Sequence, residues 1–406
     1  MQVLDVDARV HDGPAMRGAG HDALSVALID ARNRLLQRLA AFEQAGRLAL
    51  PPQPDADPPL WTLGHAGWYQ EAWIARNVQR GRGRHCTAEP TRLASIDPDA
   101  DGWFDPRQIP PAARWSLPLP PPGVVRAYLA DTLEVTLELL AACRDDDDEG
   151  LYFFRRALLQ EDLAGEALAV LAAGSGVALP GLQGPRALVA RDPIWMPATR
   201  WAQGSSEPFH LDNEAPVQDV ALPECEIDAQ PVNWAQFAEF AADGGYDDPR
   251  WWPGDAWRWV QDGERRAPRH VAQLGEVVLL ERFGGSTRVS AGQPAQHVSW
   301  YEAQAWCLWA GRRLPTEVEW EAAAVSLARR GFAFGDVWEW TASRFEPYPG
   351  FVPDPDRAWS QAGFGATRVL RGGSFAGSGR LRHPRLRGFA PPARDSGFYG
   401  FRSCAA

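Results

Sequence analysis

The segment 158–168, LLQEDLAGEAL, has the spacing of a metal-binding helix. Gln160 and Ala164 are four residues apart, so a helix places both on one face. Neighbouring residues continue this face as one stripe: Phe153, Ala157, Leu168 and Leu171. Imidazoles at two such positions would bind a transition metal, but a glutamine amide is a weak neutral ligand and alanine offers no lone pair. The segment therefore predicts a helix face that has the spacing for a pair of metal ligands but carries only one weak ligand group.

His65 is the histidine best placed to share a site with this face, because it lies in a second predicted helix. Glu161 is rotated by about 100° from the stripe and Glu166 is displaced further. The other histidines have no helical pairing with His65: His11, His21, His85, His210, His270, His297 and His383. Two interpretations of His65 stay open, a metal ligand or a hydrogen-bonded histidine at a domain interface, and the incomplete ligand set favours the second.

Helical periodicity fills the first half of the chain. Apolar residues recur at helical spacing in four segments, 21–46, 59–81, 123–143 and 149–173. Four amphipathic helices of this length predict a bundle, and bundle interiors are where metal sites are built. We predict a flexible N-terminus over 1–20, a helical bundle over 21–174, a Gly- and Pro-rich linker over 175–190, and a second domain over 191–406.

Composition limits the partners and the compartment. The chain has 406 residues and a net charge of -11, which argues against a nucleic-acid backbone as partner. It contains no apolar run of membrane-spanning length, and its first residues lack the apolar core of a signal peptide. Five scattered cysteines fit a reducing compartment, so we expect a cytoplasmic protein with no membrane partner. The oligomeric state stays open.

Four ordered motifs after residue 190 resemble one known fold. HVSWYEAQAWCLWAGRRLPTEVEWEAAA, GDVWEWTASRF, VLRGGSF and GFYGFRSC are similar to the formylglycine-generating-enzyme, or sulfatase-modifying-factor, domain. The resemblance implies an irregular α+β domain with a C-type-lectin-like core. The true formylglycine generators use a cysteine pair near the C-terminus. Here Cys404 stands alone and Cys307 lies on a predicted helix, so we reject oxidation of a peptide cysteine.

The whole chain resembles the ergothioneine synthase family, and selenoneine synthase most closely. The similar stretches include LGHAGWYQEAWIARNVQR, RLASIDPDADGWFD, LYFFRRALLQEDLAGEAL and RLRGFAPPARDSGFYGFRSC. The resemblance implies a DinB-like four-helix bundle fused to the second domain. It also implies an iron(II)- and oxygen-dependent enzyme that joins selenium or sulfur to hercynine, with a donor such as a selenosugar. The family holds iron with three histidines: His65 matches one, and Gln160 and Ala164 occupy the other two positions.

The family's substrate segment is also altered. It usually reads Arg-Asn-aromatic followed by Tyr or Asp, whereas this chain has Arg387, Gly388, Phe389 and Ala390. The resemblance assigns Tyr348 as a candidate catalytic residue. The candidate substrate-binding residues are Trp338, Tyr348, Arg385, Arg387, Phe389 and Asp395. Aromatic faces hold a trimethylammonium group by cation–π attraction, although Trp338 and Trp340 can equally be anchors of the fold.

Three functions follow as alternatives. The first is the iron-dependent synthase, with its metal site incomplete. The second is a non-catalytic relative that binds a betaine-like ligand, a sugar-like ligand or a partner protein. The third is an active enzyme altered at two histidines, which leaves Gly388 and Ala390 unexplained. In each case we expect the largest polar pocket between the halves, near His65, Gln160, Tyr348 and Arg387.

Overall fold

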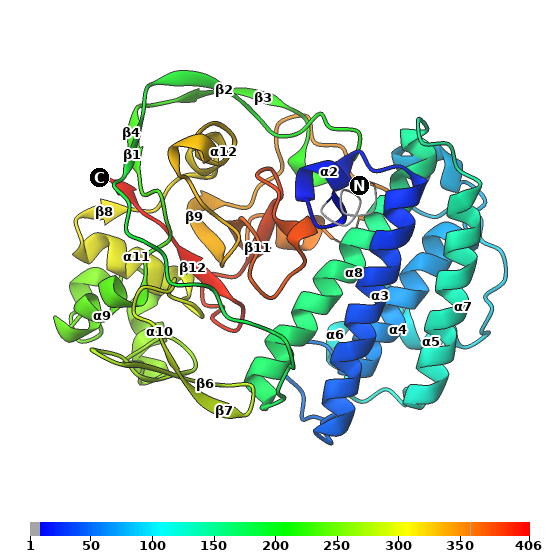
Figure 1. Cartoon of the computed structure of the whole chain (residues 1–406), viewed down its shortest axis with the longest axis horizontal. Coiled ribbons are helices and arrows are strands. Elements are labelled where there is room, and N and C mark those ends of the chain that lie inside the picture. Colours follow the sequence, from blue (N-terminus) through cyan, green and yellow to red (C-terminus); the bar gives the residue numbers. More distant parts are fainter. Residues whose placement is uncertain (1–8, 358) are drawn as a thin grey trace, which may run out of the picture.

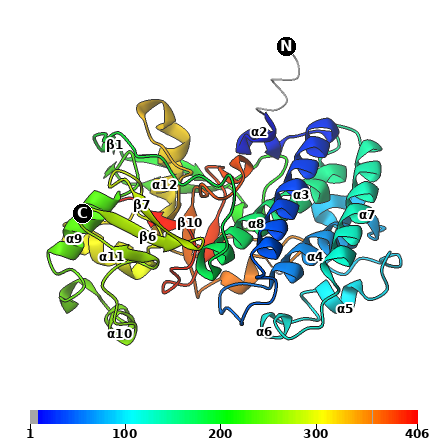
Figure 2. The same ribbon diagram turned by 60° about the horizontal axis from the view of Figure 1, so that its bottom comes forward.

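The chain folds into two units that differ in secondary structure (Figure 1). The computed structural model describes residues 9–357 and 359–406. A helical bundle packs beside a domain of short strands, helices and loops, so the predicted combination of an α bundle and an α+β domain is confirmed. Helix α8 lies at the boundary between the two units in both views (Figures 1 and 2). Side chains on different faces of α8 therefore reach different surroundings.

Four long helices form the bundle: α3 (His21–Gln44), α4 (Pro59–Gln70), α7 (Pro122–Ala141) and α8 (Asp148–Ser175). Helix α4 passes directly into a π-helical turn, η1 (Glu71–Ala75), so this helix ends earlier than predicted. Asp147 caps α8 by accepting from the Gly150 amide, and Gly176, with a φ of 74°, ends it. The shorter helices of this unit are η2 (Arg80–His85), α5 (Ala100–Phe104) and α6 (Pro111–Arg114).

The N-terminal segment differs from the prediction of a flexible end. Residues 9–20 include a short helix, α2 (Gly13–Arg17), and Val10 and Met16 are buried. The buried guanidinium of Arg17 forms an ion pair of 2.7 Å with Glu214 in the second unit. This pairing fixes a segment that the sequence pattern leaves undefined, because its partner is almost 200 residues away. Residues 1–8 lie outside the described part of the chain.

The second unit contains four small sheets among the described residues. Their strand orders are β1-β4-β13-β8, β11-β10-β9-β12, β2-β3 and β5-β6-β7. The sheet that matters for function places Trp338 on β9 and Phe389 on β11, on either side of β10. The strands are β1 (Ile194–Met196), β2 (Thr199–Gln203), β3 (Gln218–Leu222), β4 (Cys225–Ile227), β5 (Val271–Gln273), β6 (Val278–Arg282), β7 (Gly285–Val289), β8 (Arg312–Arg313), β9 (Trp338–Arg344), β10 (Arg368–Arg371), β11 (Gly388–Ala390), β12 (Tyr399–Phe401) and β13 (Cys404–Ala405).

Helices of this unit start at capping boxes. Ser299 and Glu302 cap α11, and Thr316 and Glu319 cap α12, each pair satisfying free amides of the first turn. The α-helices are α9 (Trp234–Ala242), α10 (Ala256–Asp262), α11 (Trp300–Trp309) and α12 (Glu317–Ser326). Five 3₁₀ turns complete the described elements: η3 (Asp212–Glu214), η4 (Pro249–Trp251), η5 (Ala328–Arg330), η6 (Gln361–Gly363) and η7 (Gly379–Leu381).

Charged contacts join the two units. The guanidinium of Arg380 on η7 pairs with Asp162 on α8 at 2.7 Å and with Asp30 on α3 at 2.8 Å. Because Arg380 and Asp162 are both buried, these contacts fix how the second unit sits against α8. Among the described helices, none is both long enough and apolar enough to cross a membrane.

Candidate functional site: two pockets on one helix

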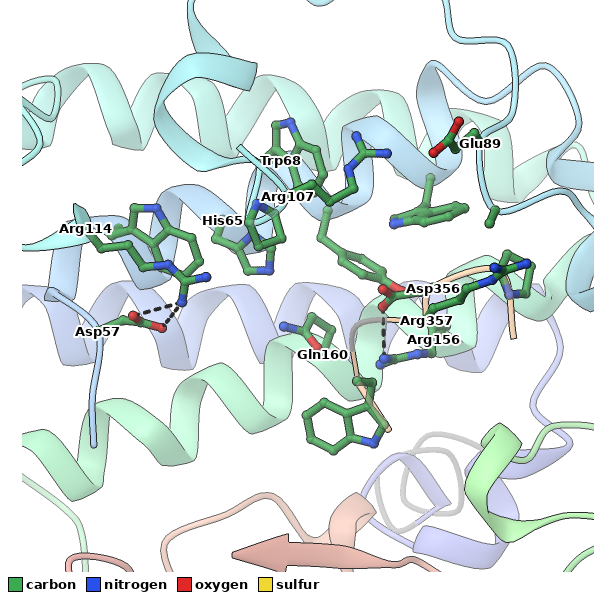
Figure 3. A pocket seen from close by; sticks show the side chains of 17 residues that line it. Asp57, His65, Trp68, Glu89, Arg107, Arg114, Arg156, Gln160, Asp356 and Arg357 are labelled. Carbon is green, nitrogen blue, oxygen red and sulfur yellow. Dashed lines mark hydrogen bonds and ion pairs between the residues drawn. The ribbon is translucent and has the colours of Figure 1, made fainter. Parts of the chain in front are cut away.

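A cavity of about 410 Å³ opens beside α4 and α8. We call it the bundle pocket. Figure 3 shows His65 and Gln160 facing the same space, with Arg156 and Asp356 beside them. Five aromatic rings and five charged side chains form most of its remaining wall: Trp61, Trp68, Tyr69, Trp73 and Trp359, and Asp57, Glu89, Arg107, Arg114 and Arg357. The stripe predicted from helical spacing is thus found where Gln160 meets His65.

His65 is held in one protonation state by its neighbours. Its ring stacks between Trp61 and Trp68, with centroid distances of 4.8 and 5.6 Å. Nδ1 lies 3.0 Å from the carbonyl oxygen of Phe104. Burial lowers the pKa of His65, and the nearby Arg114 lowers it further. The ring is therefore neutral near pH 7, and because a carbonyl can only accept, Nδ1 carries the hydrogen and Nε2 is an acceptor.

The residues at this place do not fit an iron(II) site. Gln160 lines the pocket, but Ala164 is buried, lies outside the pocket lining and has no donor atom. The described residues contain no group of three or more His, Cys, Asp or Glu side chains that could hold a metal ion. One imidazole and one amide fall short of the three protein ligands that such centres use. A divalent cation would also meet the positive charge of Arg156 in the same pocket.

Arg156 is the strongest polar feature of the bundle pocket, and the sequence analysis missed it. It lies on α8 one turn before Gln160, and it is only 2% exposed. Its Nη2 donates to Asp356 Oδ2 at 3.1 Å, and the Tyr69 hydroxyl donates to the same oxygen at 3.1 Å. Within the described residues its Nη1 has no hydrogen-bond partner. The four-residue spacing to Gln160 was the signal that could have found it.

A second cavity, of about 290 Å³, lies between α8 and the second unit. We call it the interdomain pocket. Its walls are mainly aromatic and apolar: Leu163, Val170, Trp338, Trp359, Leu370, Phe389, Phe398 and Tyr399. Trp359 lines both pockets, so the two cavities share one indole in their walls.

Glu166 is the buried acid of the interdomain pocket. The carboxylate is 6% exposed, and its Oε1 accepts from Trp338 Nε1 at 2.9 Å and from the Ser374 hydroxyl. Its other oxygen, Oε2, has no partner among the described residues. Burial raises the pKa of Glu166, although the bonds from Ser374 and Trp338 oppose that shift. A buried carboxylate oxygen without a donor favours a positively charged group beside it.

The structure separates the residues that the sequence grouped into one pocket. His65 and Gln160 line the bundle pocket, whereas Trp338, Arg387 and Phe389 line the interdomain pocket. Tyr348 lines neither cavity, because its hydroxyl donates to Glu317 at 2.6 Å and its ring packs against a guanidinium. The predicted pocket beside His65 and Gln160 is present, with Asp356 and Trp359 of the second unit in its wall, but its predicted extension to Tyr348 and Arg387 is wrong.

The remaining predicted side chains serve ion pairs or the core. Arg385 pairs with Glu321 at 3.2 Å, and Asp395 pairs with Arg265 at 2.6 Å. Neither lines one of the two pockets. Trp340 is fully buried and donates to the carbonyl of Val298 at 2.7 Å, so it is an anchor of the fold.

Arg387 reaches the interdomain pocket, but its charge is already matched. Its Nη2 lies 3.0 Å from Glu317 Oε2. Burial opposes ionisation of Glu317, yet Arg387 and Arg371 hold the pKa of that carboxyl below its usual value. The pair is thus charged, and of the Arg387 guanidinium only Nε lacks a hydrogen-bond partner among the described residues. Arg387 therefore forms part of the pocket wall, and its charge is neutralised by Glu317 rather than available to a ligand.

Comparisons with known proteins agree with the two-unit architecture. Residues 27–172 match the DinB superfamily, and residues 182–334 and 332–406 match the sulfatase-modifying factor enzyme 1-like domain. Hercynine oxygenase of Mycolicibacterium smegmatis is 32% identical over 442 residues, covering 94% of this chain and 98% of that protein. The chain belongs to the hercynine oxygenase family.

Other relatives divide into full-length and partial matches. Hercynine oxygenase of Mycobacterium tuberculosis is 31% identical and covers 94% of this chain and 98% of its own. The formylglycine-generating enzyme of Streptomyces coelicolor is 28% identical and covers 53% of this chain and 89% of its own. The family assignment rests on the full-length matches, which include both units and the α8 helix between them.

Proposed function

We propose that this member of the hercynine oxygenase family binds a betaine of the hercynine class, without the three-histidine iron centre that the family resemblance implies. The proposal deepens the family assignment by naming a ligand site. Its single strongest support is Glu166 Oε2, a buried carboxylate oxygen without a partner in a pocket walled by aromatic rings.

The chemistry of a trimethylammonium group suits the interdomain pocket. The group is cationic, cannot donate an N–H hydrogen bond and has an apolar surface, so it needs aromatic faces and an uncommitted negative charge. Trp338, Phe389 and Tyr399 supply the rings and Glu166 the charge. At the rim, Arg394 donates through Nη2 to the Asp55 carbonyl and through Nε to the Ser396 hydroxyl at 3.4 Å, so Nη1 is the nitrogen that can meet the betaine carboxylate.

Titration of the metal-free protein with hercynine tests this proposal. We expect saturable binding in the presence of a chelator, and weaker binding of histidine, which lacks the three methyl groups. Glu166→Gln should weaken hercynine binding about tenfold, because it removes the charge and keeps the shape. Glu161→Gln is the matched control, since Glu161 is also buried on α8 but is paired with Arg32 at 2.6 Å. Equal binding of histidine and hercynine would overturn the proposal.

The competing function is the active synthase, which forms a carbon–selenium or carbon–sulfur bond on hercynine. Similarity along 94% of the chain favours it, and the residues at Gln160 and Ala164 oppose it. Incubation with iron(II), oxygen, hercynine and either a thiol or a selenosugar donor tests it, with mass spectrometry of the products. Product formation together with one bound iron per chain would replace the proposal with this function. A cytoplasmic location is part of both alternatives.

A further inference from the structure

The buried guanidinium of Arg156 has a hydrogen-bonding group that the protein leaves unused. Arg156 is 2% exposed, so water at the surface does not solvate it. One N–H group reaches Asp356, and Nη1 has no partner among the described residues. Buried donors in folded proteins are nearly always paired, with protein, water or a ligand. An unpaired N–H on a charged group is costlier still.

Arg156 is the buried cation of this pocket with an unpaired N–H group, and the indole N–H groups of Trp61 and Trp359 are also unpaired among the described residues. Arg114 is bound by Asp57 at 2.8 Å, and Arg107 by Asp105 at 2.7 Å. The carboxylate of Asp356 is shared, because Tyr69 and Arg156 both donate to the same oxygen. Arg156 therefore keeps one N–H group unpaired, in the bundle pocket and beside Gln160 (Figure 3).

We infer that the bundle pocket is a carboxylate-binding site centred on Arg156 Nη1. The site lies where the family resemblance places the metal. Its ligand is a monoanionic carboxylate carried on a flat aromatic or heteroaromatic body. This inference goes beyond the betaine proposal, because it concerns a different cavity, one that binds a carboxylate rather than a trimethylammonium group.

The surroundings select the charge and shape of the ligand. A carboxylate accepts from Arg156 Nη1 in a charge-assisted bond. A dianion such as phosphate would meet the negative charge of Asp356, which lies 3.1 Å from the same guanidinium. The indoles of Trp61, Trp68 and Trp359 favour a planar apolar body. The neutral His65 Nε2 adds one acceptor, so an N–H or O–H on that body gains a further bond.

The two pockets do not share one small ligand. Arg156 and Glu166 are ten residues apart on α8, which corresponds to about 15 Å along the helix axis. A single compact zwitterion is too short to satisfy both groups at once. The carboxylate of the bundle pocket therefore belongs to a second molecule, or to the far end of an extended one.

Benzoate is the probe that tests this site, with benzamide as its uncharged match. Calorimetric titration should show benzoate binding at least about tenfold tighter than benzamide, because only benzoate makes a charge-assisted bond with Arg156. Inorganic phosphate should bind more weakly than benzoate. Equal affinities for benzoate and benzamide, or tighter binding of phosphate, would overturn the inference.

Variants on one helix locate the binding group. Arg156→Gln should weaken benzoate binding roughly tenfold to hundredfold. Its neighbour Arg155 provides the matched control, since it is equally buried but donates to the Ala19 carbonyl at 2.9 Å and pairs with Asp148 at 2.9 Å. Arg155→Gln should leave the benzoate affinity within about twofold. An equal loss in both variants would show that the effect comes from general destabilisation, and would contradict the site.

A variant that is expected to increase benzoate affinity provides a control for loss of folding, because unfolding can only decrease that affinity. Asp356→Asn keeps an acceptor for Tyr69 but removes the charge that competes for Arg156. We expect benzoate to bind several-fold tighter, which no unfolding effect can produce. Unchanged or weaker binding by a folded Asp356→Asn protein would contradict the role of Arg156. The dichroism spectrum and the thermal midpoint establish that each variant is folded.

Discussion

The bundle pocket and the interdomain pocket lie on one helix and share Trp359, but they differ in the buried charged side chain that α8 supplies. In the first, Arg156 has an N–H group without a partner. In the second, Glu166 has a carboxylate oxygen without a partner, and Arg387, whose Nε is also unpaired, is neutralised by Glu317. Arg156 and Glu166 are buried in aromatic surroundings, where an unpaired charge is costly. The difference indicates that each cavity is built for a group of opposite charge, an anion in one and a cation in the other.

The same comparison shows where the metal chemistry implied by the family resemblance is lost. The bundle pocket keeps the neutral tautomer of His65 with Nε2 free, which is the state of a histidine ready to bind a metal. Gln160 and Ala164 then supply an amide and a methyl group. The resemblance assigns the two missing ligand positions to side chains of one helix, α8, so both can be restored together.

Restoring histidine at 160 and 164 should produce the largest effect. Three imidazoles would again converge, and iron(II) affinity should rise on the order of hundredfold or more, since loss of a single outer-shell partner alone costs 10–100-fold. Iron content after anaerobic loading measures this. Each single variant should gain much less. Stoichiometric iron in the unaltered chain would show that other residues bind the metal, and no gain in the double variant would show that Ala164 lies too far from His65.

Neutralising Glu166 and Arg156 in separate variants should show whether the two pockets bind different ligands. Glu166→Gln should weaken hercynine binding about tenfold and leave benzoate unchanged, whereas Arg156→Gln should do the reverse. Both ligands are titrated into both variants. If either variant weakens both ligands equally, the pockets act as one site, and the distinction between them is wrong.

Replacing Trp359, which lines both pockets, by a smaller residue should weaken the binding of both hercynine and benzoate. Trp359 lies 5.5 Å from the Arg156 guanidinium and 5.8 Å from the Phe389 ring. Trp359→Leu removes aromatic surface from each cavity but no charge, so we expect a loss of about three- to tenfold for hercynine and for benzoate. Phe240→Leu, a buried aromatic change away from both pockets, is the control for general destabilisation. A loss for only one ligand would place Trp359 in that pocket alone.

Helical spacing predicted one pocket wall and missed the other. The stripe through Gln160 and the partner helix with His65 follow from a period of 3.6 residues, which is local information. The same rule dismissed Glu166, because it lies off the stripe. The second unit docks against that side of α8, and the docking turns an off-stripe side chain into a pocket wall. A tertiary arrangement of this kind has no local signal.

Ordered motifs predicted the second unit but not the roles of its side chains. They located Trp338 and Phe389 in a pocket wall, yet Tyr348 turns away to Glu317. Asp356 was not predicted either, because its partners Tyr69 and Arg156 come from the other unit. Sequence spacing reports which residues share an element, whereas ion pairs between units depend on how the elements meet.

The smallest predicted effect concerns Glu302, a buried glutamate outside both pockets. It allows a comparison with Glu166, which has one carboxylate oxygen without a hydrogen-bond partner. Glu302 resembles Glu166 in burial, but both its oxygens are occupied, by Tyr246 and by Ser299. Burial raises the pKa of Glu302 to about 7, from an ordinary value of 4.5. Between these values the unfolded chain loses the proton while the folded chain keeps it.

The free energy of unfolding should therefore fall as the pH rises from 4.5 to 7, by roughly 1 kcal/mol per pH unit from this group. The contribution is complete below the unfolded pKa and lost above the folded one. Glu302→Gln cannot ionise, so its slope in this window should be shallower by that amount, measured by urea unfolding at several pH values. Hercynine should bind the variant normally, because the carboxylate serves the fold alone. An unchanged slope would show that Glu302 is ionised in the folded protein, and that its hydrogen bonds outweigh its burial.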